Sequence, residues 1–346
     1  MPSKKMPSKL NDVARAMVAP DRGILAADES SGTIRQRFNA IGLPSTKENR
    51  RAYRHMLFTT EGMEQFISGV ILYDETLRQK ALDEAETPFP RLLSDKGVIP
   101  GIKVDTGIHD LAGFPGEKVT EGLDGLRARL TRYGKLGAKF AKWRAVITVG
   151  KGIPTDVCID ANAHALARYA ALCQECGIVP IVEPEVLMDG DHNIYRCDEV
   201  TGVTLRQVFE ALAVYEVKLD GIVLKPSMVI SGSECPEQAS VEEVARRTVN
   251  NFLRNVPREV PGVAFLSGGQ SSETATAHLN AMNHMFGELP WELSFSYGRA
   301  LQAAPLRAWG GDPARFKAGQ EAFFHRAMCN SAARTGTYSA DMETAA

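Results

Sequence analysis

The sequence lacks an excess of charge of either sign, and this absence excludes a broad class of partners. Forty lysine and arginine residues stand against 42 aspartate and glutamate residues in a chain of 346, which gives a formal net charge of −2. Proteins that bind nucleic acid or anionic lipid mainly through electrostatic attraction carry a surplus of basic side chains. We therefore expect neither a nucleic-acid partner nor a membrane partner.

Long apolar runs, cysteine and paired histidines are also scarce. No apolar run approaches the roughly 18 residues of a membrane-spanning helix, and no apolar stretch follows the basic residues 1–9 as in a secretory signal. Six cysteines are too few for a disulfide scaffold. The seven histidines form no HxxxH or HxH pair that would suggest metal ligands. These absences predict a cytoplasmic protein with reduced thiols and no metal site.

Eight short apolar runs recur along the chain, and a helical pattern follows each of them. Runs of this kind, bounded by glycine, proline and aspartate, are typical of strands buried on both faces. They lie at residues 23–28, 68–74, 98–105, 138–146, 177–186, 220–226, 261–269 and 291–298.

This alternation predicts a (β/α)8 barrel with N- and C-terminal extensions. A doubly wound open sheet is the main alternative, but no GxGxxG motif follows the first run. We expect a single barrel domain over residues 1–333 and a small, polar, flexible tail over residues 334–346.

Polar side chains that are costly to bury lie inside these runs or at their carboxyl ends. The active site of a (β/α)8 barrel lies at that end of the strands. A structural ion-pair network would explain any single pair, whereas so many positions at one end favour an active site. The positions are Asp28, Asp74, Lys103, Asp105, Lys142, Arg144, Glu183, Glu185, Lys225, Ser267 and residues 296–299.

Lys225 is the sharpest chemical signal in the sequence. Its amine stands between an apolar run and Pro226, where it is poorly solvated. Poor solvation favours the neutral, nucleophilic form of lysine, and a nearby cation such as Lys142 would act in the same direction. We therefore predict a lysine that forms a Schiff base. The alternative is a strand-end lysine whose ammonium group reaches solvent.

Two glutamates are candidates for the general acid and base that imine chemistry requires. Glu183 and Glu185 are two residues apart, as are Lys142 and Arg144, so each pair faces one side of its strand. The alternative is that one glutamate merely neutralises Lys142 or Arg144.

Two regions have the composition of phosphate sites. The loops after the seventh and eighth strands, residues 266–271 and 296–300, contain glycine, and the second includes Arg299. Hydroxyl residues open the helix after the first strand, where free N–H groups suit a second anion. Plain glycine turns and ordinary helix capping are the alternatives. Two such sites around a central lysine would suit a bisphosphorylated carbonyl substrate.

Several motifs resemble those of the class I, Schiff-base-forming fructose-bisphosphate aldolases. GILAADESSGTI, GIKVD, AKWR, VEPEV, LKPSMV, FLSGGQS and SFSYGRAL stand in the order and spacing of that family, from residue 23 to about residue 333. The resemblance implies a (β/α)8 barrel, assembled as a homotetramer, that uses neither a metal nor another cofactor. It also implies cleavage and formation of fructose 1,6-bisphosphate, from and to dihydroxyacetone phosphate and glyceraldehyde 3-phosphate, in glycolysis and gluconeogenesis.

The resemblance also implies a role for each matching residue. Lys225 would form the imine, Glu183 would act as acid and base in carbinolamine dehydration, and Asp28 would take the C4 hydroxyl proton. Glu185 and Lys142 would position and polarise the site, with Arg144 supporting the charge network. One phosphate would contact Ser267, Gly268, Gly269, Ser296 and Arg299, and the other Ser30, Thr33, Arg37 and Lys103.

The sequence departs from the animal members of that family at three places. Thr33 replaces a serine, and Gln36 stands where lysine is common, which would weaken the second phosphate site. The sequence ends in METAA and lacks the family's terminal tyrosine, which assists proton transfer at the carbanion stage; Tyr338 is the only tyrosine of the tail. Turnover and the preference between fructose 1,6-bisphosphate and fructose 1-phosphate therefore stay open.

The residues by themselves leave two other functions open. An imine-forming barrel of the transaldolase or deoxyribose-phosphate type would need one phosphate site, whereas two are expected here. A catalytically silent barrel that serves as a scaffold would have lost the lysine or its acid and base partners, which are all present.

Overall fold

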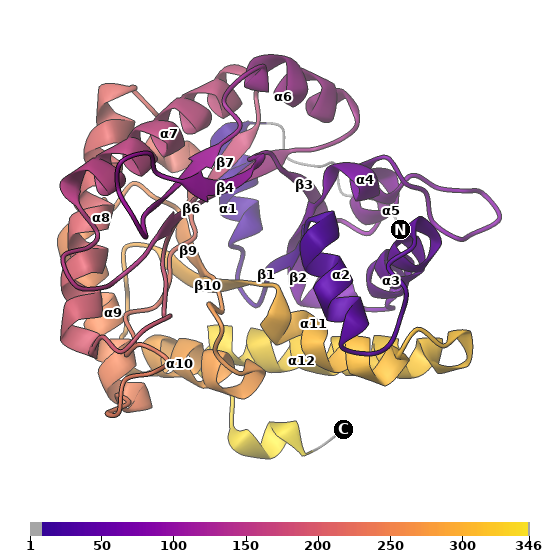
Figure 1. Ribbon diagram of the computed structural model, residues 1–346. Helices are drawn as coiled ribbons and strands as arrows, with labels where there is room; N and C mark the ends of the chain where they lie inside the picture. Colours follow the sequence, from indigo (N-terminus) through magenta and orange to yellow (C-terminus); the bar gives the residue numbers. More distant parts are fainter. Residues whose placement is uncertain (1–8, 345–346) are drawn as a thin grey trace.

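The computed structural model describes residues 9–344, in which eight parallel strands close into a barrel (Figure 1). Around the barrel the strands follow the order β1-β10-β9-β8-β7-β6-β3-β2. Each of the eight predicted runs overlaps one of these strands, so the predicted (β/α)8 barrel is confirmed. They are β1 Gly23–Ala27, β2 Ile67–Leu72, β3 Ile99–Lys103, β6 Phe140–Ile147, β7 Val179–Val186, β8 Val223–Leu224, β9 Gly262–Phe265 and β10 Glu292–Tyr297.

Helices surround the strands on the outside of the ring (Figure 1). Several begin at a hydroxyl or amide N-cap whose side chain accepts a backbone N–H of the first turn, such as Ser240 before α9 and Ser271 before α10. The helices are α1 Leu10–Met17, α2 Ser31–Asn39, α3 Lys47–Thr59, α4 Asp74–Leu77, α5 Phe89–Asp95, α6 Leu126–Lys135, α7 Asp156–Glu175, α8 Ile194–Val214, α9 Val241–Asn255, α10 Ser272–Met285, α11 Arg299–Trp309 and α12 Phe316–Arg334. Short 3-10 turns are η1 Met63–Gln65, η2 Leu219–Gly221, η3 Pro313–Arg315 and η4 Ala340–Glu343.

The N-terminal helix α1 closes one end of the barrel. Its apolar face, which includes Val13 and Met17, packs in one buried cluster with barrel residues such as Ile24, Phe140 and Ile181. A second cluster fills the space between the strands and the outer helices. Because α1 seals the barrel at this end, the opposite end is left open for a cavity.

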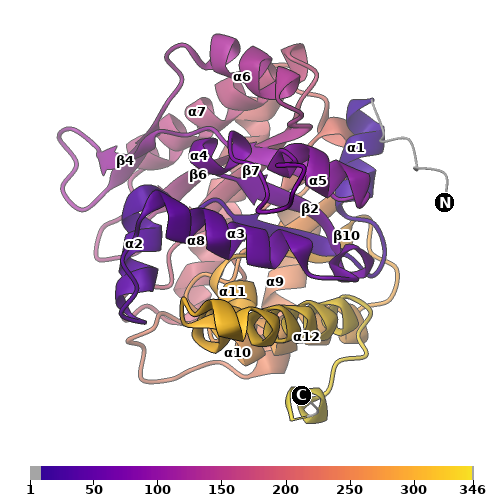
Figure 2. The same cartoon turned by 90° about the vertical axis from the view of Figure 1, so that its right-hand side faces the viewer.

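A hairpin that the sequence analysis did not expect follows β3 at that opposite end. Its strands are β4 Gly107–Asp110 and β5 Lys118–Glu121, paired antiparallel. Figure 2 shows the hairpin projecting at one end of the barrel and α1 at the other. Most of its residues are partly or fully exposed, so it carries no apolar pattern that would reveal a strand.

The segment after α12 folds back beside that helix. Arg334, the last residue of α12, donates to the carbonyl oxygens of Leu293 and Val18 at 2.9 and 2.8 Å. Tyr338 donates its hydroxyl to Glu343 at 2.7 Å, and Glu343 also pairs with Arg326 of α12. The flexibility of the tail stays a prediction.

Within residues 9–344, no helix combines the length and the apolar composition that crossing a membrane would require.

Candidate active site

A cavity of about 1030 Å³ opens at the carboxyl ends of the barrel strands. Its walls include every residue for which the sequence predicts a catalytic or substrate-binding role except Gly269. These residues are Asp28, Ser30, Thr33, Arg37, Lys103, Lys142, Arg144, Glu183, Glu185, Lys225, Ser267, Gly268, Ser296 and Arg299. Seven of the eight barrel strands, all except β2, thus bring these polar residues to one place.

Strand alternation explains why β6 and β7 direct charged side chains into the barrel. Lys142 and Arg144 face the cavity, whereas Trp143 between them faces outward and packs against Tyr169 of α7, with ring centroids 5.6 Å apart. On the neighbouring strand, Glu183 lies beside Arg144 in the register of the sheet. On each of these two adjacent strands, the charged residues that are two positions apart therefore point to the same side, into the cavity.

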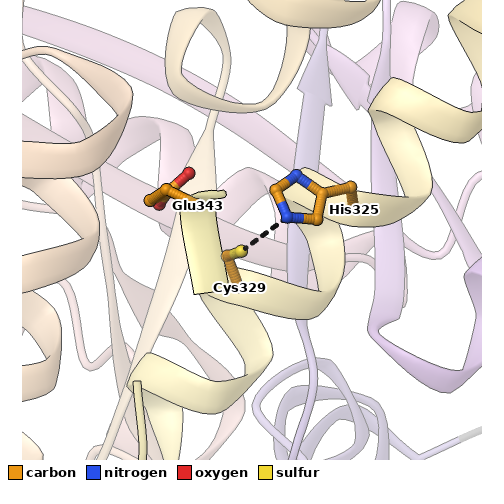
Figure 3. A group of neighbouring side chains, drawn as sticks. All are labelled: His325, Cys329 and Glu343. Atoms are coloured by element: carbon orange, nitrogen blue, oxygen red, sulfur yellow. Dashed lines mark hydrogen bonds between the residues drawn. The ribbon is translucent and has the colours of Figure 1, made fainter. Parts of the chain in front are cut away.

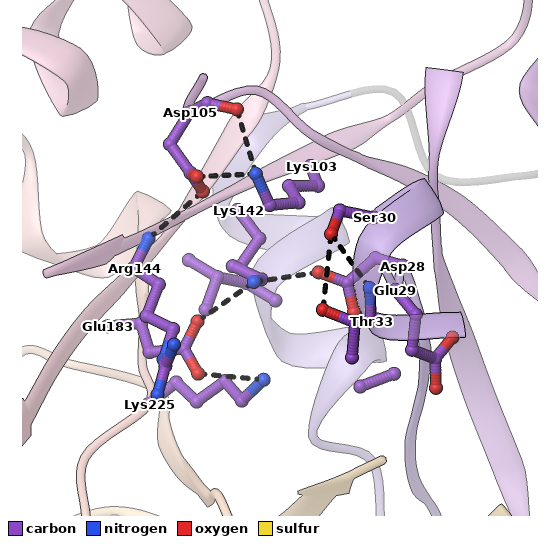
Figure 4. A network of polar contacts seen from close by, with 12 residues as sticks. Asp28, Glu29, Ser30, Thr33, Lys103, Asp105, Lys142, Arg144, Glu183 and Lys225 are labelled. Atoms are coloured by element: carbon purple, nitrogen blue, oxygen red, sulfur yellow. Dashed lines mark hydrogen bonds and ion pairs between the residues drawn. The ribbon is translucent and has the colours of Figure 1, made fainter. Parts of the chain in front are cut away.

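Two lysines and two carboxylates form the centre of the cavity (Figure 4). Lys225 Nζ lies 3.0 Å from Oε1 of Glu183, and Lys142 Nζ lies 3.3 Å from Oε2 of the same carboxylate. Lys142 Nζ also lies 2.7 Å from Oδ2 of Asp28. All four residues are less than a tenth exposed. One ammonium group thus bridges two carboxylates, and one carboxylate bridges two amines.

These contacts set the protonation of the buried groups. Burial by itself would raise the pKa of Asp28, but the charges of Lys142 and Lys225 outweigh burial and hold that pKa at about 2. The same opposition between burial and the two lysines leaves the pKa of Glu183 below its usual value. Burial would lower the pKa of Lys142, yet Asp28 and Glu183 raise it above its usual value. At neutral pH both carboxylates are ionised and Lys142 is charged.

Two further ion pairs flank this centre. Arg144 donates to Glu185, and Lys103 pairs with Asp105, whose carbonyl oxygen also accepts from Lys103 Nζ at 2.8 Å. The sequence left open which glutamate neutralises which cation. In the structure, Glu185 pairs with Arg144 while Glu183 contacts both lysines.

The loops after β9 and β10 form one region suited to an anion. Gly268 and Gly269 have φ angles of +53° and +94°, a backbone conformation that side chains disfavour. A Cβ on Gly269 would meet Met188 Sδ at 2.9 Å, so the turn leaves no room for a side chain at this position. Ser296 is 1% exposed, and within residues 9–344 its hydroxyl has no hydrogen-bond partner. A buried hydroxyl facing a cavity without a partner is suited to a ligand oxygen.

Arg299 completes this region at the first residue of α11. The helix begins after Gly298, whose lack of a side chain leaves the first N–H groups of α11 without a side-chain cap. The Arg299 side chain is exposed, and among the described residues no carboxylate forms an ion pair with it. A free guanidinium beside an open helix N-terminus favours an anion such as phosphate.

In the second predicted phosphate region, the polar side chains already have partners within the chain. Ser30 caps α2 by accepting the N–H of Thr33 at 3.4 Å, and the two hydroxyl oxygens are 3.1 Å apart. Arg37 pairs with Glu29. Because Lys103 also has its own carboxylate partner, an anion here would have to compete with contacts inside the chain.

Glu29 is a residue to which the sequence analysis assigned no role. Its buried carboxylate accepts from Arg37, from Arg54 of α3 and from Gln302 of α11, the last at 2.7 Å. The Glu29 carboxylate therefore links Arg37 of α2 to side chains of α3 and α11. The sequence contains one indication of this role, because Asp28 and Glu29 are adjacent acidic residues directly after β1. Side chains of adjacent residues in extended backbone point in different directions, so Glu29 needs cationic partners other than those of Asp28.

The fold and the site together define a class of enzyme. The fold is a (β/α)8 barrel, and its cavity places buried lysines between carboxylates, beside a region suited to an anion. This combination is typical of a lyase that acts on a phosphorylated carbonyl compound through a lysine imine.

Comparison with known proteins identifies the family. The family described as "Fructose-bisphosphate aldolase class-I" matches residues 9–346. A probable fructose-bisphosphate aldolase class 1 of Xanthomonas campestris pv. campestris is 58% identical over 331 residues, which cover 95% of this chain and 98% of the relative. Fructose-bisphosphate aldolase C of Carassius auratus is 51% identical, over 95% of this chain and 91% of the relative.

A solved structure agrees with these sequences. The fructose-bisphosphate aldolase of Plasmodium falciparum, solved in complex with TRAP and a small-molecule inhibitor, superposes with a TM-score of 0.94 at 48% identity, covering 97% of this chain and 98% of that one. The chain belongs to the class-I fructose-bisphosphate aldolase family. The resemblance drawn from its motifs is thereby confirmed, and the chain is a carbon–carbon lyase of the Schiff-base class.

Proposed function

We propose that Lys225 is the residue that forms the Schiff base with the ketone of fructose 1,6-bisphosphate. Its position opposite Glu183, at 3.0 Å, supports this role. Glu183 first takes a proton from the Lys225 side chain, which it contacts. The neutral amine then adds to the C2 carbonyl carbon, and a proton passes from the nitrogen to the former carbonyl oxygen to give a carbinolamine. Glu183, having received a proton, then protonates the departing hydroxyl, which leaves as water and yields the protonated imine.

Asp28 is the proposed base for the bond-breaking step. It takes the proton from the C4 hydroxyl, the C3–C4 bond breaks, and its electron pair moves into the protonated imine to form an enamine. Glyceraldehyde 3-phosphate leaves. Protonation of the enamine at C3 and hydrolysis of the imine then release dihydroxyacetone phosphate and restore Lys225. Asp28 is suited to accept a proton because it is ionised at neutral pH.

Lys142 has the role of holding this arrangement. In the free enzyme its ammonium group contacts both Asp28 and Glu183, so each carboxylate is kept ionised and aimed at the cavity. Glu185 lies two residues after Glu183 on β7, and Arg144 lies opposite Glu183 on β6. We assign the ion pair between Glu185 and Arg144 the role of supporting Glu183.

The phosphates are assigned to the two ends of the cavity. Ser267, Gly268, Ser296 and Arg299 bind one phosphate, and Gly269 acts by shaping the turn. Ser30, Thr33, Arg37 and Lys103 bind the other after giving up part of their contacts within the chain. Gln36, which lines the cavity in place of a lysine, weakens that second site.

The contact of both lysine amines with the one carboxylate of Glu183 is the observation that carries this proposal. Its test is borohydride reduction in the presence of dihydroxyacetone phosphate, followed by mass mapping of peptides. We expect a single covalent adduct on Lys225, absent from the Lys225→Met variant. An adduct on Lys142 or Lys103 instead, or no adduct, would overturn the assignment.

Assembly and location are proposed on separate observations. Exposed apolar side chains on α7 and α8, among them Val157, Tyr195 and Val214, support contact between copies, and we propose a homotetramer. Light scattering should give the mass of four chains. All six cysteines are free, which supports a reducing, cytoplasmic compartment. Cell fractionation tests this location.

A further inference from the structure

Three potential metal ligands meet outside the active-site cavity, between α12 and the C-terminal segment. His325 and Cys329 are four residues apart on α12, so their side chains lie on one face of the helix, and Glu343 reaches them from η4 (Figure 3). Their ligand atoms all lie within 4.8 Å of one another. Within residues 9–344 this is the only place where three such groups come so close.

The distances fit the coordination of a small transition-metal ion. Cys329 Sγ lies 3.6 Å from Nε2 of His325. Zinc holds sulfur at about 2.3 Å and nitrogen at about 2.0 Å, and two such ligands at a tetrahedral angle are about 3.5 Å apart. The backbone of α12 therefore already sets two of the ligands at the required separation.

We propose that His325, Cys329 and Glu343 bind one divalent transition-metal ion of the zinc type, and that this ion fastens the C-terminal segment to α12. Imidazole nitrogen, thiolate sulfur and carboxylate oxygen form a ligand set that zinc accepts, with a fourth position for water. The site is separate from the cavity that contains Lys225, so the inference does not rest on the proposed mechanism.

Binding requires two local changes, and both are small. The Cys329 thiol gives up its proton to solvent as the sulfur–metal bond forms, so that one proton leaves for each ion bound. His325 Nε2 carries the proton that it donates to the carbonyl oxygen of Met342, 2.7 Å away. As the ion binds, the ring changes to the tautomer protonated on Nδ1, so Nε2 gives up that hydrogen bond and offers its lone pair to the ion. The thiolate and the carboxylate carry two negative charges, which partly offset the divalent ion and the Arg326 guanidinium that pairs with Glu343.

The surroundings of Glu343 already orient its carboxylate. Tyr338 donates its hydroxyl to Oε1 at 2.7 Å, and Arg326 pairs with Oε2. Each carboxylate oxygen has a second lone pair, so both contacts can persist while one oxygen binds the ion. Outer partners of this kind fix ligand orientation in metal sites. Cys329 is fully buried, which protects the sulfur–metal bond from solvent.

Titration of the metal-free full-length chain with cobalt(II) chloride and zinc chloride tests the proposal. We expect one cobalt ion per chain, with a thiolate-to-cobalt charge-transfer band and the visible bands of four-coordinate cobalt, and displacement by zinc. Cys329→Ser should abolish the charge-transfer band. Glu343→Gln, at a half-buried position that leaves the helix intact, should weaken binding about tenfold or more.

Matched variants and a second readout complete the test. Cys197→Ser, at an equally buried thiol of α8, and Glu321→Gln, at an exposed carboxylate of α12, should bind cobalt like the parent chain. Zinc should slow hydrogen exchange over residues 335–344 in the parent chain but not in Glu343→Gln. Absence of a thiolate–cobalt band, its survival in Cys329→Ser, or unchanged exchange on saturation with zinc would overturn the proposal.

Discussion

Lys225, directly after β8, faces Glu183 of the neighbouring strand β7, with Nζ 3.0 Å from Oε1. The backbone N–H of Lys225 donates to the carbonyl oxygen of Val182, so the ladder between β7 and β8 fixes this approach. The barrel itself thus holds an amine and a carboxylate within hydrogen-bond reach, so the proposed first step of imine formation would need no large movement.

Replacing Glu183 by glutamine should slow imine formation and hydrolysis. The amide keeps the shape of the side chain but cannot transfer a proton, and loss of a general acid–base typically costs about 10²- to 10⁴-fold in rate. We expect a fall of that order in kcat for fructose 1,6-bisphosphate cleavage, together with slower borohydride trapping at Lys225. Glu199→Gln, at an exposed site of α8, serves as control. Normal trapping rates in Glu183→Gln would contradict the assigned role.

Replacing Lys142 by methionine should damage stability as well as activity. The change leaves Asp28 and Glu183 buried without their shared cation, and breaking a buried ion pair in this way typically costs about 3–5 kcal/mol. Urea unfolding measures the loss. The double variant with Asp28→Asn should lose less than the sum of the two single variants, because the second change removes one of the uncompensated charges. If the losses of unfolding free energy in the two single variants simply add in the double variant, Lys142 and Asp28 do not stabilise each other.

Stability should fall in acid in a range set by Asp28. Its pKa is about 2 in the folded chain and 3.8 when unperturbed. Because the folded value is the lower one, the contribution is fully present above the unperturbed pKa and is lost as the pH falls through about 4 to about 2. Over that range Asp28 alone should account for about 2 kcal/mol of the free energy of unfolding. Asp28→Asn should therefore show a shallower decline; an unchanged slope would contradict the shifted pKa.

Replacing Arg299 by alanine should weaken phosphate binding with little effect on stability. The side chain is exposed and, among the described residues, forms no ion pair, so the folded chain loses no internal contact. We expect KM for fructose 1,6-bisphosphate to rise about tenfold, the effect of losing one charge-assisted contact. Arg307→Ala, exposed on the same helix, is the matched control. Equal KM values for the two variants would remove Arg299 from the phosphate site.

Cleavage should survive excess EDTA. The covalent imine withdraws electrons from the breaking bond, so the reaction as proposed needs no Lewis acid. Chelation would remove an ion from the His325–Cys329–Glu343 site without affecting kcat. Loss of cleavage with EDTA and its rescue by zinc would contradict the imine mechanism.

The sequence predicted much of the fold because the relevant signals are local. Apolar runs, helical periodicity and capping residues depend on neighbours a few positions away, and these signals located all eight barrel strands. The hairpin of β4 and β5 was missed because its short, largely exposed strands carry no apolar pattern. The candidate site residues could also be predicted, since polar groups at the ends of apolar runs are conspicuous.

By itself, the sequence determined the barrel, the lysine at its mouth and the membership of the family, because each of these rests on residue types in a fixed order. Only the tertiary structure decided which partners meet: Glu183 between Lys142 and Lys225, Glu185 with Arg144, Glu29 with Arg37 and Arg54, and Glu343 beside His325 and Cys329. Such contacts depend on the register between strands and on how distant helices pack when the barrel closes, and neither leaves a local trace in the order of the amino acids.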